Sequence, residues 1–250
     1  MKQSSIHGSI NGSRLIRFLS DLDVSDVIVS HENFAEKLGR LIDLSDSVTV
    51  SESLRGLTRM KFEPEDVSGD IVQEQFLQQR MAIVHSIIES FSPSAGVVRF
   101  KLPIPKAGAS VKNCMDYSPY QRFYSVHQSE ISFKVQKLQA SVRAAVSGYS
   151  PELAQLAEID KSLGNILLVH SRKLFAVVPK LLAQRFETLL NKHLAKCKDK
   201  AIIDDPMLWA MPGGWLNKFC NEMQQLLLAE LEVRLQPTLG LVEALNEKVE

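Results

Sequence analysis

The chain has 250 residues, enough for one large domain or two small ones with a substantial core. Its 29 basic and 29 acidic side chains balance and 45% of its residues are hydrophobic, as in an ordinary soluble globular protein. No apolar run approaches the roughly 18 residues of a membrane span, and the N-terminus leads into polar sequence rather than a signal peptide. Cys114, Cys197 and Cys220 are widely spaced, which suits reduced thiols and predicts a cytoplasmic protein.

The first part of the chain predicts short helices. Apolar residues recur at helical spacing over 13–22 and 30–42, and a third short helix is expected over 46–57. The alternation of Ser47–Val50 leaves a strand open within that third stretch. Residues 59–68 are charged, contain a proline and indicate a linker.

A longer helix is expected to begin at Ser68 or Asp70 and to end near Ser90. The prolines and glycines that follow, up to Tyr117, exclude a long helix and predict an irregular segment over 92–117. Within it, the alternating residues 97–102 are consistent with either a strand or an extended docking segment.

A helical hairpin dominates the second half of the sequence, from Ser118 to about Lys198. Ser-Pro pairs at Ser118 and Ser150 mark the starts of its two arms, because serine caps helices and proline is tolerated at the first helical position. The first arm has a seam of apolar spacing formed by Tyr120, Tyr124, His127, Ile131, Val135, Leu138, Val142 and Ala145.

The second arm is less regular. Pro179 is expected to kink or split it. Its expected stripe comprises Leu153, Leu156, Asp160, Leu163, Leu167, His170, Leu174, Val177, Leu181 and Leu189. After a loop, a final helix is expected from about Trp215 until Pro237 stops it, followed by a short helix over 239–245.

The balanced charge hides segregation along the chain. Residues 161–200 contain 9 basic and 2 acidic side chains, whereas residues 201–250 contain 3 basic and 8 acidic ones. The favoured interpretation is that acidic segments pack against the basic hairpin or that these are solvated faces. The alternative is a nucleic-acid-binding surface made of Arg172, Lys173, Lys180, Arg185, Lys192, Lys196, Lys198 and Lys200.

Catalytic and cofactor motifs are absent from the sequence: it has no phosphate-binding glycine loop, serine elbow, zincin or paired-cysteine motif. His193 and Cys197 are four residues apart and could share a helix face as metal ligands, but two ligands do not make a site, and a solvated helix end is favoured. We therefore predict no enzyme, metal or cofactor.

Polar residues on the hairpin stripes are interpreted structurally. His127 and His170 are expected to be hydrogen-bonded core histidines rather than ligands or catalysts. Asp160 is expected to pair with Arg143 across the hairpin turn, in preference to acting as a functional acid.

The C-terminal part offers candidate partner-binding residues: Trp209, Trp215, Leu227 and Leu231. Tryptophans beside a Pro-Gly-Gly turn seal a core or anchor a partner, and the core is favoured here. The leucine-rich run from Glu222 to Leu235 is apolar nearly all round and is expected to be buried within the fold or in an oligomer.

Three blocks of the sequence resemble an uncharacterised proteobacterial family with a domain of unknown function: residues 11–19, residues 118–124, and a C-terminal block formed by 212–216, 226–237 and 240–241. Proteins similar to this family are encoded beside a stator-like membrane protein of the MotA/TolQ type and a peptidoglycan-binding protein of the OmpA/MotB type. Such clusters look like the type III form of the Zorya anti-phage defence system. The resemblance implies a cytosolic accessory or effector component and brings no catalytic residues.

We therefore predict an all-α protein with short N-terminal helices, a long antiparallel hairpin and a C-terminal helical cap. The expected segments are 1–58, 59–117 and 118–250. The expected function is non-enzymatic and depends on contacts with another cytosolic component of the system and with the cytoplasmic part of the motor. Nucleic-acid binding, with DNA as partner, is the alternative.

Overall fold

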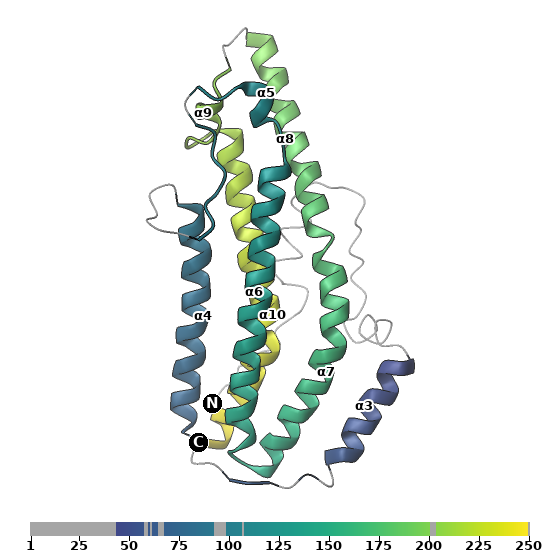
Figure 1. The fold of residues 1–250 in the computed structure, drawn as a ribbon. Coiled ribbons are helices and arrows are strands. Elements are labelled where there is room, and N and C mark those ends of the chain that lie inside the picture. Colours follow the sequence, from purple (N-terminus) through teal and green to yellow (C-terminus); the bar gives the residue numbers. More distant parts are fainter. Residues whose placement is uncertain are drawn as a thin grey trace, which may run out of the picture.

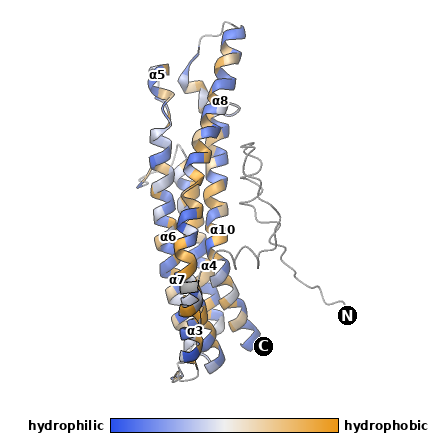
Figure 2. Ribbon diagram, turned by 90° about the vertical axis from the view of Figure 1, so that its right-hand side faces the viewer, coloured by the Kyte–Doolittle hydropathy of each residue, from blue (hydrophilic) through white to orange (hydrophobic). Residues whose placement is uncertain are grey.

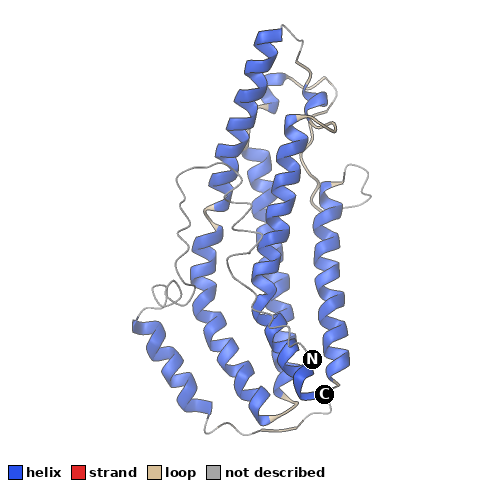
Figure 3. Ribbon diagram, turned by 180° about the vertical axis from the view of Figure 1, so that it is seen from behind, coloured by secondary structure: helices blue, strands red, loops and turns tan. Residues whose placement is uncertain are grey.

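The computed structural model describes residues 44–57, 60, 62–64, 68–92, 99–106, 108–200 and 204–249. This part of the chain is helical and contains no strand, which confirms the all-α prediction (Figure 3). None of the helices described combines the length and the apolar composition needed to cross a bilayer. The two helices expected over 13–22 and 30–42 lie outside the described residues.

Among the described residues, four long helical rods form an up-down-up-down bundle (Figure 1). In chain order the rods are α4 (Gly69–Phe91), α6 (Ser118–Ser147), α7 (Pro151–Phe175) continued by α8 (Val178–Lys200), and α10 (Trp215–Val249). The last rod, α10, contacts all the others, so it is the centre of the bundle rather than the cap that was expected.

Three shorter helices accompany the rods in the part of the chain that the structure describes. Helix α3 (Leu44–Leu57) lies against α7 and confirms the helix expected there, in place of the strand that was left open. Helices α5 (Val111–Cys114) and α9 (Pro206–Trp209) lie in the connections at the end of the bundle where α8 finishes (Figure 1). Residues 99–102 form no strand; instead the Leu102 amide donates to the Ser90 carbonyl at 3.1 Å and returns the chain to the end of α4.

Both Ser-Pro pairs mark helix starts as predicted, but they are capped differently. The Ser150 hydroxyl accepts from the Leu153 amide at 3.3 Å, with Pro151 as the first helical residue. In the first arm, Ser118 already belongs to α6, and the Asp116 carboxylate accepts from the Ser118 amide at 2.9 Å. A carboxylate two residues upstream therefore replaces the serine that was expected to cap.

The second arm splits where Pro179 predicted a break. Helix α7 ends at Phe175 and α8 begins at Val178. Proline has no amide hydrogen, so the carbonyl four residues earlier, that of Phe175, loses its helical donor. The Gln128 side-chain amide on α6 donates to that carbonyl at 3.1 Å, so the carbonyl regains a hydrogen-bond donor inside the bundle.

Pro237 does not stop the final helix, contrary to the expectation. Helix α10 continues through it to Val249, so the separate helix expected over 239–245 is part of α10. Gln139 on α6 donates to the Arg234 carbonyl at 3.3 Å beside the proline. Leu241, Val242 and Leu245 beyond it are buried, and their packing outweighs the roughly 3 kcal/mol that an interior proline costs.

Apolar residues line the interior of the bundle and polar residues its outer faces (Figure 2). The seam predicted for α6 is confirmed, since every member from Tyr120 to Val142 is buried. The stripe predicted for the second arm is partly wrong, because Leu156, Leu174 and Val177 are exposed. The second arm has no single buried stripe, because the helix breaks at residues 176–177 and because α3 covers part of α7.

Candidate functional site

We call residues 192–199 of α8 together with residues 204–214 the apical end of the bundle (Figure 1). Beneath it, aromatic rings from α6, α8 and α10 stack continuously in the core. Phe186 lies 5.2 Å from both Phe219 and Trp215, centroid to centroid, and Trp215 lies 5.3 Å from Trp209. This aromatic core gives the apical end a rigid base.

Three potential metal-ligating side chains meet at the apical end: His193 and Cys197 on α8, and Asp204 ahead of α9. One ligand atom from each lies within 4.8 Å of the other two. His193 Nε2 is 2.8 Å from Asp204 Oδ1 and 3.5 Å from Cys197 Sγ. The sequence predicted that the histidine and cysteine share a helix face; the carboxylate is the residue that sequence reasoning missed.

A local signal for Asp204 exists in the sequence. Asp204-Asp205-Pro206 has the form of a helix start, and Asp205 caps α9 by accepting from the Met207 amide at 2.9 Å. The carboxylate that precedes this helix start lies against His193 of α8. Spacing in the sequence alone does not reveal this contact.

Trp209 fixes the carboxylate. Its side chain is buried and its indole N–H donates to Asp204 Oδ1 at 2.6 Å. Gly213 has a φ of 88°, in the left-handed region that favours glycine. A Cβ on Gly214 would lie 2.6 Å from the Leu208 carbonyl oxygen and would overlap that of Trp209, so only glycine fits there. The Pro-Gly-Gly turn therefore holds the tryptophan, and the tryptophan holds the carboxylate.

Two buried polar atoms in this cluster find no hydrogen-bond partner among the described residues: Asp204 Oδ2 and Trp215 Nε1. Desolvation and the Asp204 carboxylate raise the pKa of the Cys197 thiol. Buried polar atoms without partners are uncommon, so two in one cluster distinguish this place within the described part of the chain.

The surface of the apical end is apolar beside these groups. Met207, Leu208 and Met211 are 47%, 60% and 50% exposed. In contrast, the side chains predicted as partner anchors are buried within the chain's own core: Trp209, Trp215, Leu227 and Leu231. The favoured interpretation of these four as core residues agrees with this burial, and the apolar side chains exposed at the apical end are instead those beside Trp209.

The basic residues predicted for nucleic-acid binding divide into three groups. Arg172, Lys173, Lys180, Lys192, Lys196 and Lys198 are at least partly exposed on α7 and α8. Arg185 is buried and makes a bidentate pair with Glu222, at 2.7 and 2.9 Å, so it belongs to the core. The side chain of Lys200 lies outside the described residues.

A second polar cluster lies at mid-height, where α7 gives way to α8. Glu230 is completely buried and accepts from Tyr124 at 2.6 Å, from Gln128 at 2.8 Å and from Arg234 at 2.8 Å. The Arg234 guanidinium also lies 3.9 Å over the ring of Phe175. Burial raises the pKa of Glu230, and the three donors oppose that rise.

The predicted ion pair of the hairpin is confirmed. Arg143 Nε donates to Asp160 Oδ2 at 2.6 Å, and both side chains are largely buried. His170 pairs with Asp46 of α3 at 3.5 Å and is half-buried, so it connects α7 to α3 at the edge of the fold. Asp160 and His170 therefore have structural partners.

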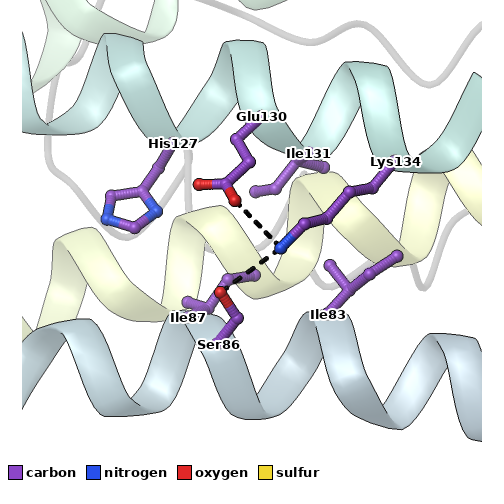
Figure 4. A pocket seen from close by; sticks show the side chains of 7 residues that line it. All are labelled: Ile83, Ser86, Ile87, His127, Glu130, Ile131 and Lys134. Carbon is purple, nitrogen blue, oxygen red and sulfur yellow. Dashed lines mark hydrogen bonds and ion pairs between the residues drawn. The ribbon is translucent and has the colours of Figure 1, made fainter. Parts of the chain in front are cut away.

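His127 is buried as expected but lacks the expected hydrogen bond: its Nε2 finds no partner within the described part of the chain. It lines a cavity of about 10 Å³ between α4 and α6, beside Glu130, Lys134 and Ser86 (Figure 4). A second cavity of about 90 Å³ lies between residues 102–104 and the start of α10. Both are far smaller than the roughly 300 Å³ at which small-molecule sites begin, and the first has room for about one water.

The fold and its surfaces define a class: an all-α four-helix bundle, within the described residues, whose apical end exposes apolar side chains beside basic ones. The chain belongs to DUF3348, a family of proteins of unknown function whose model matches residues 1–247. No curated protein and no solved structure matches it.

Proposed function

We propose that this protein is a non-enzymatic cytoplasmic adaptor that binds a protein partner through the apical end. The exposure of Met207, Leu208 and Met211 is the observation that carries this proposal. Surface apolar residues are common singly, but three on one short rigid turn form the kind of anchor that protein partners bury.

Rigidity favours binding at this turn. Trp209 lies between the exposed residues in sequence and is itself buried, so its backbone and theirs are fixed by the core. A preformed anchor loses little conformational entropy when a partner covers it. Methionine adds an adaptable apolar surface that tolerates imperfect complementarity.

The charges beside the turn indicate the chemistry of the partner. Lys192, Lys196 and Lys198 lie on the last turns of α8 with their side chains accessible. A protein segment that combines acidic side chains with apolar ones matches both the lysines and the methionines. The resemblance to components of type III Zorya systems supplies a setting: another cytosolic component, or the cytoplasmic part of a MotA/TolQ-like motor, provides that acidic segment in an anti-phage response.

The test is co-purification from cells that express the whole gene cluster, with the tag on this chain. Leu208→Asp is expected to reduce recovery of the partner by at least tenfold. Met81→Asp is the matched control, because Met81 is a similarly exposed apolar residue, 66% against 60% for Leu208, and lies on α4. Loss of recovery with Met81→Asp but not with Leu208→Asp would place the contact elsewhere, and recovery of no encoded component with the unmodified chain would refute the proposal.

Nucleic-acid binding is the second candidate, and the six accessible basic side chains of α7 and α8 are the observation that favours it. Binding of this kind depends steeply on salt and little on sequence. Lys196→Glu together with Lys198→Glu is expected to weaken DNA binding uniformly across sequences and to reduce the salt slope by about 1 for each lysine that pairs with a phosphate. The absence of binding at low salt would eliminate this candidate for the isolated chain.

A further inference from the structure

We infer that His193, Cys197 and Asp204 form a zinc-binding site that fastens the end of α8 to the connection before α9. This inference goes beyond the proposed adaptor function and does not depend on it. It rests on the convergence of three different donor atoms, nitrogen, sulfur and oxygen, within 4.8 Å of one another.

The spacing suits a tetrahedral ion. Zinc bonds of about 2.0–2.3 Å in tetrahedral arrangement place neighbouring ligand atoms about 3.3–3.6 Å apart. Cys197 Sγ and His193 Nε2 are 3.5 Å apart, within that range. Asp204 Oδ1 and His193 Nε2 are 2.8 Å apart, a hydrogen-bond distance, so the carboxylate has to move by about half an ångström to bind.

The geometry disfavours a cysteine nucleophile with a catalytic dyad or triad. In such a relay the acid and the nucleophile bind opposite nitrogens of the imidazole, so that a proton passes through the ring. Here the Asp204 oxygen and the Cys197 sulfur both lie beside the same nitrogen, Nε2 of His193. Three metal-ligand atoms that converge in this way can surround a single cation.

The surroundings support the carboxylate as a ligand. Trp209 donates to Asp204 Oδ1 and orients the group, as the outer hydrogen bonds of metal ligands do. Asp204 Oδ2 is buried and has no partner among the described residues, so the hydrogen bonding of this carboxylate is incomplete within that part of the chain.

Donor chemistry selects the metal. Thiolate and imidazole ligands favour zinc, whereas magnesium and calcium take oxygen ligands almost exclusively. Two ligands four residues apart on a helix with a third from a following segment is a common zinc arrangement. Three protein ligands leave the fourth position to a water.

Zinc titration of the purified full chain, stripped with a chelator and dialysed, tests the inference. One zinc per chain is expected, and His193→Ala, Cys197→Ser and Asp204→Asn are each expected to weaken binding at least tenfold. Cys114→Ser is the matched control, since Cys114 is similarly half-buried but lies outside the cluster, and it is expected to bind as the unmodified chain does. Equal binding by Cys197→Ser and the unmodified chain, or no binding at micromolar zinc, would overturn the inference.

Cobalt(II) gives a second readout, which identifies the ligand atoms rather than the strength of binding. A thiolate-to-cobalt charge-transfer band is expected in the unmodified chain and in Cys114→Ser, and it should vanish in Cys197→Ser. Zinc is also expected to slow hydrogen exchange in the last two turns of α8 and to leave the middle of α6 unaffected, because the ion joins only the apical segments. A band that survives Cys197→Ser would contradict the assignment of this sulfur. Neither readout involves a partner, so failure of the adaptor proposal would leave them unchanged.

Discussion

The carboxylates of Glu230 and Asp204 differ in how completely their oxygens are hydrogen-bonded. At mid-height, both oxygens of Glu230 accept hydrogen bonds from side chains of α6 and α10. At the apical end, Oδ1 of Asp204 contacts His193 Nε2 and accepts a hydrogen bond from Trp209, while Oδ2 has no partner in the part of the chain that the structure describes. A fully hydrogen-bonded buried network rigidifies the helices that it joins, whereas a buried polar atom without a partner requires a separate explanation.

The position of each cluster fits its role. Glu230 lies where α7 breaks, and Gln128 bonds both its carboxylate and the freed carbonyl of Phe175. The network therefore spans a defect in one rod with side chains from two others. Asp204 lies where the chain leaves the bundle, next to exposed methionines and lysines. A substitution there is therefore expected to alter the surface of the apical end and to leave the packing of the rods unchanged.

The largest effect is expected from breaking the completed network. Arg234→Met keeps most of the side-chain volume but leaves the fully buried Glu230 without its cation. Removing one partner of a buried ion pair costs about 3–5 kcal/mol of unfolding free energy. Urea unfolding at neutral pH measures it, monitored by far-UV circular dichroism.

The control for this prediction is the double variant Arg234→Met with Glu230→Gln. Because the neutral amide no longer needs a cation, we expect it to regain most of the lost stability. If the single variant is as stable as the unmodified chain, Arg234 does not compensate the buried charge of Glu230 and the network does not hold the rods in register.

A smaller and more local effect is expected at the apical end. Gly214→Ala forces a Cβ against the carbonyls of Leu208 and Trp209, and backbone atoms cannot yield as a flexible side chain can. We expect a loss of about 1–3 kcal/mol. The damage should concentrate in residues 204–214, with faster hydrogen exchange there and unchanged exchange in the middle of α6.

Gly240→Ala in α10 serves as the matched control, because no atom lies within 4 Å of its Cβ position. An alanine in an open helical position is expected to be neutral or slightly stabilising. Equal destabilisation by the two substitutions would show that the close approach at Gly214 does not constrain the turn.

The sequence predicted the rods much better than it predicted their interruptions and their surface. Continuous apolar spacing identified the seam of α6 because local periodicity and tertiary burial coincide there. Pro179 and Pro237 look alike in sequence, yet the rod breaks before Pro179 and continues as a helix through Pro237. The outcome depends on packing by distant residues. The Arg143–Asp160 pair was predictable since a short turn joins the two residues' helices, whereas Glu230 and Asp204 meet partners that only the folded chain brings close.

The smallest effect is expected at His127. Two histidines, His193 and His127, differ in the same way as the two carboxylates, because one has a polar partner and Nε2 of the other has none among the described residues. His193 has Asp204 beside it, while His127 is surrounded by the rings of Phe91, Phe100 and Phe123. Burial lowers the pKa of His127 below 6.5, with Glu130 opposing and Lys134 adding to the shift. As the pH falls, the unfolded chain therefore binds the proton before the folded one does. The stability present above about pH 6.5 is lost as the pH falls toward the folded-state pKa.

His127→Leu removes this titration, so we expect the variant to lose less stability than the unmodified chain between about pH 7.5 and about pH 5.5. Urea unfolding at the two pH values measures the difference. Ile131→Val is the matched control in the same seam: it is expected to lower stability by about 0.5–1.5 kcal/mol at both pH values and to keep the original pH dependence. An unaltered pH dependence in His127→Leu would mean that the protein accommodates the charged imidazole, with water in the adjoining cavity completing its hydrogen bonds.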